Sequence, residues 1–333
     1  MTILQTLLRT NTFRIPLFRT LVPSVVLAYG IQTAVAIPSI AARTEKFYDL
    51  SGSLTYLSCT ALSLFLPYLR ARAAGNFSGG IAEYLSAPAT GQALWWWRHV
   101  ALSVCVWTWA ARLGSYLFNR VSEDGKDSRF DSIRDSAPKF YGAFFAQATW
   151  VSLCLFPVFA VNSLPRSAFA RSGPQNEVAS AAVSAKPYLS DIVGLVVFAF
   201  GWAFEIVADR QKSRWSREKR EKKHSEEFLT KGLWSRSRHP NYFGEVMLWS
   251  GIAMVAGGLL VRGPAQVGLG LGGVGGKALV AGMCAVSPGF VSFLLLKVSG
   301  VPLSEEKYDM RFGDRKEYRE WKENTPMLVP RLW

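Results

Sequence analysis

Residues 188–208 read YLSDIVGLVVFAFGWAFEIVA, an almost uninterrupted apolar run that decides the fold class. A helix that crosses the hydrocarbon core of a bilayer needs about 20 mainly apolar residues, and this run has that length. The connector that follows, residues 209–240, carries eleven lysines and arginines against five acidic residues. An apolar block of membrane length that ends in a basic connector predicts a membrane helix followed by a segment in water.

The same alternation recurs along the chain, so the predicted fold class is all-α, a polytopic transmembrane helical bundle. The lipid bilayer is then the first expected partner. We expect about seven membrane helices, at residues 17–38, 50–69, 93–118, 139–163, 188–208, 243–261 and 278–297.

Composition and charge narrow the possible functions. Half of the 333 residues are hydrophobic, which excludes a disordered or fibrous protein. The net charge of +14 favours anionic partners, namely lipid head groups, nucleic acid or a phosphorylated cofactor. We expect no nucleic acid, because acidic residues dilute the basic connector and no binding motif accompanies it. The four cysteines lie inside apolar blocks without metal-ligand spacing, so they predict packing and no metal site.

The basic connector also predicts the orientation of the chain. Loops rich in lysine and arginine stay in the cytosol, which places residues 209–240, the loop 119–138 and the tail after Lys297 on that side. The amino terminus would then lie opposite, although Arg9, Arg14 and Arg19 precede the first acidic residue. A mitochondrial presequence, an interfacial helix and an error in the helix count all remain open as explanations.

Two further features receive ordinary structural interpretations. Arg98 and His99 follow Trp95–Trp97, a composition typical of an anchor at the level of the lipid head groups. The glycine-rich stretch 257–276 contains a GxGxxG pattern, but no strand precedes it as a dinucleotide fold requires, so we expect a flexible linker. The glycines of that pattern are Gly268, Gly270 and Gly273.

The richest polar motif is residues 231–251, KGLWSRSRHPNYFGEVMLWSG, which leads from the basic connector into an apolar helix. Proline at a helix start is pre-organised, and free N–H groups there attract anions. Arg236 and Arg238 are suited to bidentate phosphate binding beside that start. Asn241 and Glu245 are four residues apart and share a helix face. The motif predicts that a phosphate-bearing ligand docks against the helix opening at Pro240.

Two other stretches carry clustered charge and aromatic residues. Glu205 and Asp209 share one face at the expected end of the fifth helix, where each pairs with an arginine or a ribose hydroxyl. The alternative is that Asp209 only ends the helix in the head-group layer. The segment 210–229 is charged all round and predicts a solvated helix or linker without chemistry. The tail after residue 302 predicts a surface helix on which Tyr308, Arg311 and Phe312 share a face.

These blocks, in this order, resemble the carboxy-terminal domain of the steroid 5-alpha-reductase superfamily over roughly residues 100–333. The RHPNYFGE segment is also similar to sterol C14- and Δ7-reductases. The resemblance divides the chain into N-terminal membrane helices at 1–92 and a reductase-like membrane domain at 93–333, whose C-terminal half holds NADPH at the cytosolic side. The matching blocks are ARLGSYLFNR, EDGKDSRF, FYGAFFAQATW, FEIVADRQK, GLWSRSRHPNYFGEVMLWSGI and EEKYDMRFG.

Carried over by position, the resemblance implies that Asp209 and Asn241 contact the cofactor and that Glu245 holds its amide or ribose end. The whole set expected to bind cofactor is Asp209, Lys212, Trp234, Arg236, Arg238, His239, Asn241, Glu245, Tyr308 and Arg311. The match has two departures. Glu205 stands where the steroid enzymes carry an asparagine, and Trp109 falls near the tyrosine that helps to hold a steroid ketone. Steroid specificity therefore does not carry over.

The function implied is that of an NADPH-dependent oxidoreductase acting on CH–CH groups. It would reduce an activated C=C bond in a lipid-like substrate such as a sterol or enone. A tyrosine or glutamate with an adjusted pKa is the expected proton donor, and Tyr242 is the candidate because it lies beside the cofactor motif. An apolar substrate can enter from the lipid. The resemblance favours the endoplasmic reticulum membrane over a mitochondrial membrane.

Two alternatives remain open. RHPNYFG and the pair Glu305-Glu306 also resemble isoprenylcysteine carboxyl methyltransferase, a membrane enzyme that uses S-adenosylmethionine. The upstream blocks FEIVADRQK and GKDSRF favour the reductase. A non-catalytic membrane binding protein of the same fold is the second alternative, because fold alone does not guarantee activity.

Overall fold

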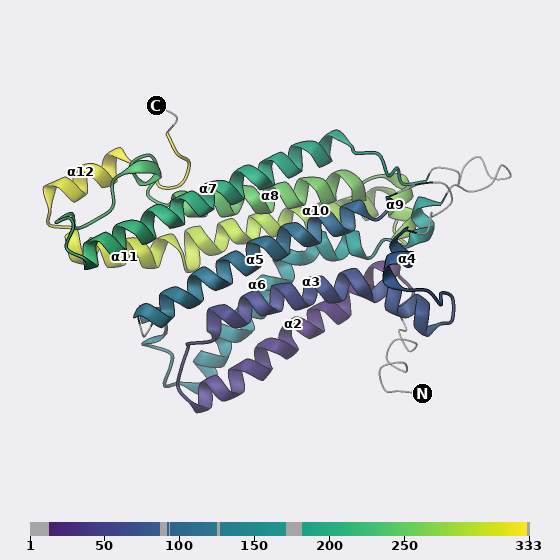
Figure 1. Cartoon of the computed structure of the whole chain (residues 1–333), viewed down its shortest axis with the longest axis horizontal. Helices are drawn as coiled ribbons and strands as arrows, with labels where there is room; N and C mark the ends of the chain where they lie inside the picture. The colour runs from purple at the N-terminus through teal and green to yellow at the C-terminus, as the bar shows by residue number, and fades with distance from the viewer. Residues whose placement is uncertain (1–12, 87–91, 93, 125–126, 171–181, 332–333) are drawn as a thin grey trace. The chain divides into compact units, whose positions relative to one another are not determined.

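The computed structural model describes residues 13–86, 92, 94–124, 127–170 and 182–331, without the side chains of 119–124 and 128. Arg9 therefore lies outside the described residues. The helices are α2 (Pro16–Ala41), α3 (Tyr48–Ala73), α4 (Ile81–Ser86), α5 (Trp97–Asp124), α6 (Ala137–Asn162), α7 (Leu189–Arg220), α8 (Pro240–Leu260), α9 (Gly263–Gly268), α10 (Gly273–Phe293), α11 (Val301–Phe312) and α12 (Lys316–Asn324) (Figure 1).

The predicted fold class is confirmed: the described residues form helices and no strand, and seven of the helical stretches are long and apolar enough to cross a membrane. Two predicted boundaries were wrong. The fifth helix does not end near residue 208, because α7 continues to Arg220 with side-chain pairs such as Arg214–Glu218 (2.8 Å) on its surface. The stretch 257–276 is not a plain linker, since it holds α9 and the first turn of α10.

Packing divides the chain into two compact units. Unit 1 comprises Met1–Ile192 and Ile252–Ser287, and unit 2 comprises Val193–Gly251 and Pro288–Trp333. The boundaries fall inside α7, α8 and α10. The predicted boundary at residue 92 was drawn from sequence resemblance, not from packing. These two units do not test it, and it stays a prediction.

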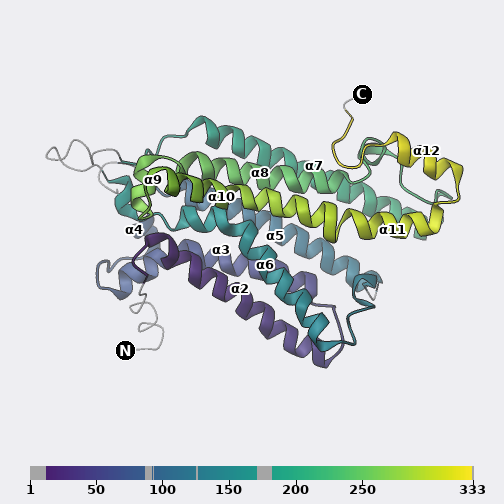
Figure 2. The ribbon, with the colours of Figure 1, turned by 180° about the vertical axis from the view of Figure 1, so that it is seen from behind.

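In unit 1, α2, α3, α5 and α6 pack against one another (Figures 1 and 2). The turn between α2 and α3 is tied to the segment after α5 by Glu45, which accepts hydrogen bonds from Arg134 (2.7 and 2.8 Å) and from the N–H of Asp127 (2.9 Å). Burial raises the pKa of Glu45, but these hydrogen bonds outweigh burial, so its pKa lies below the usual value. The EDGKDSRF block thus has a structural role in this unit.

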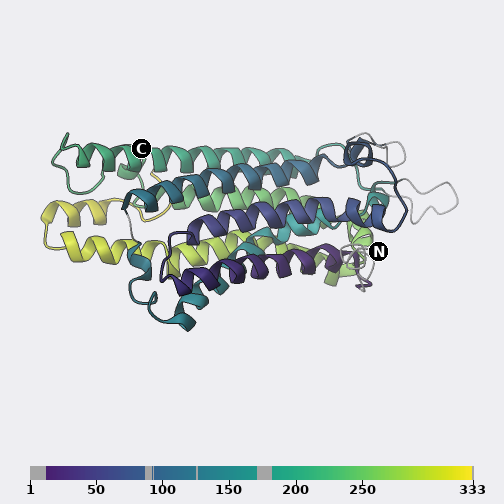
Figure 3. The same ribbon diagram turned by 60° about the horizontal axis from the view of Figure 1, so that its bottom comes forward.

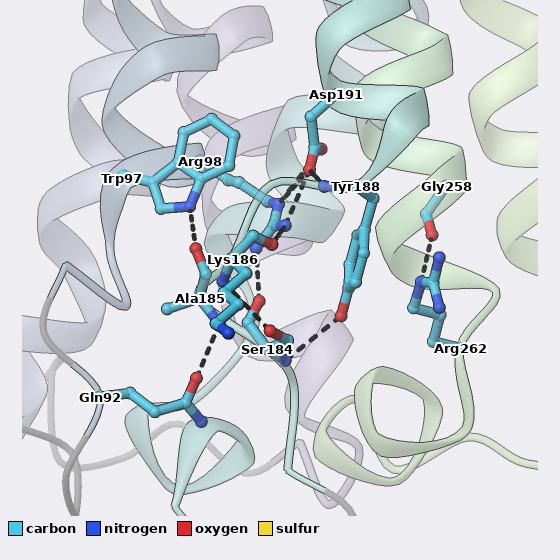
Figure 4. A network of polar contacts seen from close by, with 10 residues as sticks. All are labelled: Gln92, Trp97, Arg98, Ser184, Ala185, Lys186, Tyr188, Asp191, Gly258 and Arg262. Carbon is cyan, nitrogen blue, oxygen red and sulfur yellow. Dashed lines mark hydrogen bonds and ion pairs between the residues drawn. The ribbon is translucent and has the colours of Figure 1, made fainter.

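Arg98 is the centre of a buried polar network in unit 1 (Figure 4). Its side chain is 0% exposed and pairs with Asp191, with Nη2 2.7 Å from Oδ2. Its remaining donors reach the carbonyls of Ser184 (2.8 Å) and Lys186 (2.7 Å), and the ring of Tyr188 lies 4.5 Å from the guanidinium carbon. The expected head-group anchor was wrong for Arg98, since its side chain is buried and its guanidinium bonds protein groups.

In unit 2, α7 and α8 run antiparallel and approach closely. A side-chain carbon on Gly244 would lie 2.7 Å from both the Glu205 N–H nitrogen and the Gly201 carbonyl, so only glycine permits this approach. One turn further along α7 lies Asp209, and one turn back along α8 is the helix start at Pro240. The helices α11 and α12 fold back on each other (Figure 3), joined by Tyr318 and Asp309 (2.8 Å).

Candidate functional site

Unit 2 contains two adjoining cavities that share four lining residues. The first, called here the aromatic pocket, is lined by Lys212, Trp215, Ser216, Leu229, Trp234, Arg238, His239, Ser304, Glu305, Tyr308, Tyr318 and Trp321. The second, called here the basic groove, has a volume of about 350 Å³ and is lined by Lys212, Trp215, Lys219, Glu227, Ser304, Lys307, Tyr308, Arg311 and Phe312.

One face of α7 supplies a wall to both cavities. Lys212, Trp215, Ser216 and Lys219 are spaced so that they project from the same side of the helix. The prediction of a helix in segment 210–229 is confirmed as far as Arg220. The segment is not solvated on every side, because one face lines both cavities, and the prediction that it has no chemistry is not tested. Arg210, Arg214, Arg217 and Arg220, on the other faces of α7, are exposed, which is why this part of the sequence resembles a solvated helix.

The RHP segment is held in place from two sides. Trp234 donates from its indole nitrogen to the carbonyl of Ala208 (3.0 Å), which ties the turn before α8 to α7. The N–H of Arg238 donates to the Pro326 carbonyl (2.9 Å), and the N–H of His239 donates to the Met327 carbonyl (3.1 Å). These N–H groups just before α8 are thus committed to the C-terminal segment. The predicted phosphate contact at the opening of α8 itself stays a prediction.

An acidic cluster from α11 joins the motif to the tail. Glu305 lies 3.1 Å from Arg238 Nη1, 3.2 Å from His239 Nε2 and 3.4 Å from Lys322 Nζ. Lys322 also bonds Asp309 (2.6 Å). Glu305 on α11 thus pairs with the cations of Arg238, before α8, and Lys322, on α12, and it contacts the imidazole of His239 at the edge of the aromatic pocket.

Tyr242 lies beside His239 on the first turn of α8. Its ring is parallel to the imidazole, with the centroids 5.2 Å apart and the planes inclined by 2°. Burial lowers the pKa of His239, and the hydrogen bond to Glu305 offsets only part of that effect. The imidazole is therefore neutral at pH 7, and Tyr242 stacks on an uncharged ring.

The structure brings together six of the sequence-predicted site residues. Those that line the aromatic pocket or the basic groove are Lys212, Trp234, Arg238, His239, Tyr308 and Arg311. The predicted residues outside the two linings are Asp209, Arg236, Asn241, Tyr242 and Glu245. Asp209 and Glu245 are buried at 4% and 9% exposure, whereas Arg236 is exposed. Their assignment to the cofactor stays a prediction.

Sequence reasoning missed several lining residues. Trp215 and Lys219 belong to the segment that had been expected to have no chemistry. Lys307 lies in the EEKYDMRFG block but was not predicted as a site residue, and neither was Trp321. A helical-wheel pattern on α7, with Trp215 three residues after Lys212, is the one signal that could have indicated a lined face.

Some buried polar atoms have no hydrogen-bond partner among the described residues. Among them are Nε of Arg238 and the indole nitrogen of Trp321, which line the aromatic pocket, and the side-chain oxygen of Asn241 on the first turn of α8. Buried donors and acceptors without partners are costly, so they mark places where a polar ligand would complete the bonding. Two donors and one amide oxygen suit a ligand that carries phosphate or hydroxyl oxygens together with an amide group.

The lowered pKa of His239 predicts a pH dependence of stability. As the pH falls below about 6.5, His239 becomes protonated in the unfolded chain but stays neutral in the folded chain. Acidification therefore favours the unfolded chain and lowers the free energy of unfolding. We expect the thermal midpoint of the wild-type protein to fall more between pH 7 and pH 5 than that of His239→Gln. Equal losses in the two proteins would contradict the assignment. The measurement is thermal unfolding in detergent followed by circular dichroism.

Comparison with protein families finds a match over most of the chain. The family model described as "Protein of unknown function (DUF1295)" matches residues 77–263 and 267–325, which is most of the chain and includes every residue that lines the two cavities. No curated protein matches this chain. No solved structure matches it either. With seven membrane-length helices and a family match over more than half of its length, the chain belongs to the DUF1295 family.

Proposed function

We propose that this protein is an NADPH-dependent membrane reductase that reduces an activated C=C bond in a lipid-like substrate. The observation that carries the proposal is the basic groove adjoining the aromatic pocket in unit 2. A dinucleotide needs both environments, because its phosphates require cations and its rings require flat apolar surfaces. The resemblance of the sequence blocks to steroid 5-alpha-reductases supports the same assignment.

The balance of charge favours a phosphate-bearing cofactor. Four cationic side chains line the basic groove, and its single acidic residue, Glu227, also lies 3.4 Å from Arg315. The cations are Lys212, Lys219, Lys307 and Arg311. S-adenosylmethionine has a sulfonium cation and no phosphate, so this groove repels it where it attracts NADPH. The methyltransferase alternative, which rests on Glu305-Glu306, gains little because Glu305 is already balanced by Arg238 and Lys322.

Roles for the remaining residues follow from their positions. In this proposal the cations of the basic groove hold the pyrophosphate and the 2′-phosphate, and the indole nitrogen of Trp321 donates to a ligand oxygen. The free side-chain oxygen of Asn241 accepts from a carboxamide. When bound, the cofactor supplies a hydride to an electron-poor carbon, and Tyr242 delivers a proton to the neighbouring carbon. The endoplasmic reticulum remains the proposed membrane.

Ligand-dependent stability tests the choice of cofactor. We expect NADPH to raise the thermal midpoint of the detergent-purified protein, and S-adenosylmethionine to leave it unchanged. The double variant Lys307→Gln/Arg311→Gln removes two phosphate contacts and should weaken NADPH binding about tenfold or more. Lys316→Gln is the matched control, since its side chain is 80% exposed and outside both cavities.

The outcomes separate the candidate functions. Stabilisation by S-adenosylmethionine alone would identify the methyltransferase and overturn the proposal. Binding of NADPH without consumption of cofactor in the presence of enone lipids would favour the non-catalytic binding protein. Equal weakening in the control and the double variant would mean that net charge, and not the groove, attracts NADPH.

A further inference from the structure

Unit 1 contains a cavity of about 850 Å³ that the proposed reductase chemistry does not use. It is called here the arginine cavity, and residues from α2, α3, α4, α9 and the turn after α6 surround it. The lining is Pro16, Arg19, Thr20, Pro67, Arg70, Ala71, Asn76, Tyr84, Ser163, Pro165, Arg166, Ser167, Ala168, Ala170, Pro264, Val267 and Gly268.

Positive charge is concentrated in this cavity. Arg19, Arg70 and Arg166 line it from three different segments, and its described lining includes no aspartate or glutamate. Arg19 and Arg70 are close enough for their charges to repel each other. Three like charges that line one cavity favour the binding of an anion there.

Two of the arginines differ in their bonding. Arg19 is oriented by hydrogen bonds to the carbonyls of Phe13 (2.8 Å) and Arg14 (3.3 Å). The Nε of Arg70 is buried and has no hydrogen-bond partner among the described residues. A buried guanidinium donor without a partner is costly, and an oxyanion in the cavity would satisfy it.

One glycine of the pattern that was expected to form a flexible linker, Gly268, lies in the wall of this cavity. A side-chain carbon on Gly268 would lie 2.7 Å from that of Ala168, so glycine lets α9 approach the turn after α6. Gly270 has φ +71 and lies against Pro16 at the start of α2. The pattern therefore shapes the cavity through close backbone approach.

We propose that the arginine cavity binds an anion of the phosphate type. Arg70 lies in the last turn of α3, Arg19 in the first turn of α2, and both helices are membrane-length. The cavity thus lies at helix ends, where phospholipid head groups are found. Serine, threonine and asparagine side chains in the lining add donors for phosphate oxygens. A lipid head group and a soluble phosphate share this chemistry.

Protection of Arg70 in the wild-type protein tests the proposal. Purified protein is treated with phenylglyoxal, which modifies arginine, and labelled peptides are quantified by mass spectrometry. We expect dioleoylphosphatidic acid to slow labelling of Arg70 at least threefold, with dioleoylphosphatidylcholine as the lipid comparison. Arg43, whose side chain is 73% exposed in the same unit, is the internal control and should not be protected. Protection by inorganic phosphate as well would show that soluble phosphate suffices.

Variants provide the second arm. The double variant Arg19→Gln/Arg70→Gln should weaken binding of dioleoylphosphatidic acid about tenfold or more, as measured by native mass spectrometry. The control is Lys139→Gln, which removes an exposed charge outside the cavity and should bind this lipid like the wild type. The labelling experiment uses the wild-type protein, so it tests the proposal even if the double variant does not fold. Equal labelling of Arg70 with and without both probes would overturn the proposal.

Discussion

Replacement of Arg98 by methionine is expected to lower the free energy of unfolding by about 3–5 kcal/mol, because it leaves the buried carboxylate of Asp191 without its partner. Asp191 is 1% exposed, and the guanidinium donates three hydrogen bonds to its carboxylate, one of 2.7 Å and two of 3.1 Å. The carbonyls of Ser184 and Lys186 would also lose a donor. The measurement is denaturation in mixed micelles with increasing sodium dodecyl sulfate, followed by circular dichroism.

Two further variants distinguish the effect of the positive charge of Arg98 from the effect of the planar geometry of its guanidinium. Arg98→Lys keeps the charge but cannot bond Asp191 and two carbonyls at once, so we expect an intermediate loss. The double variant Arg98→Met/Asp191→Leu removes both charges and should recover much of the stability. If Arg98→Met unfolds at the wild-type detergent concentration, the network in Figure 4 does not hold this part of unit 1 together.

Replacement of Tyr242 by phenylalanine should reduce the rate of enone reduction about 10²- to 10⁴-fold, because a positioned proton donor contributes an effect of that size. The expectation rests on the proposed function. The ring would still stack on His239, so NADPH should bind as tightly as to the wild type. The measurement is single-turnover loss of NADPH fluorescence with an enone lipid that the wild-type protein reduces.

Tyr318→Phe is the matched control. Its hydroxyl donates to Asp309 (2.8 Å), and burial together with this carboxylate raises the pKa of Tyr318, so it is bound in the structure and poorly suited to give up a proton. We expect its rate to stay within about tenfold of the wild type. Loss of the rate in Tyr308→Phe, with Tyr242→Phe active, would assign the proton donor to Tyr308, which lines both cavities.

The seven membrane-length helices could be predicted from the sequence, because hydrocarbon thickness sets the length of an apolar run and that length is a local property. The segment 188–208 is an example: its apolar character predicts a helix wherever it packs. The end of α7 was missed, since hydropathy marks where a chain leaves lipid and not where its backbone hydrogen bonds stop.

Part of the candidate site was also visible in the sequence. The RHP motif at residues 238–240 and Tyr308 were identified from residue types and resemblance, and the structure brings Arg238, His239 and Tyr308 to one pocket. The residues opposite them could not be identified, because Trp215 and Trp321 have ordinary local surroundings. Their role depends on which helix faces they present after folding.

Local patterns in the chain thus determined the helical class, the number of membrane-length helices and the basic motif, since each depends on neighbours a few residues apart. Only the tertiary structure decided that Ser237 bonds to Leu328, 91 residues away, that Arg98 is buried against Asp191, and that Gly268 lies in the wall of a cavity. Such pairings depend on long-range packing, in which each side chain's surroundings come from distant parts of the sequence.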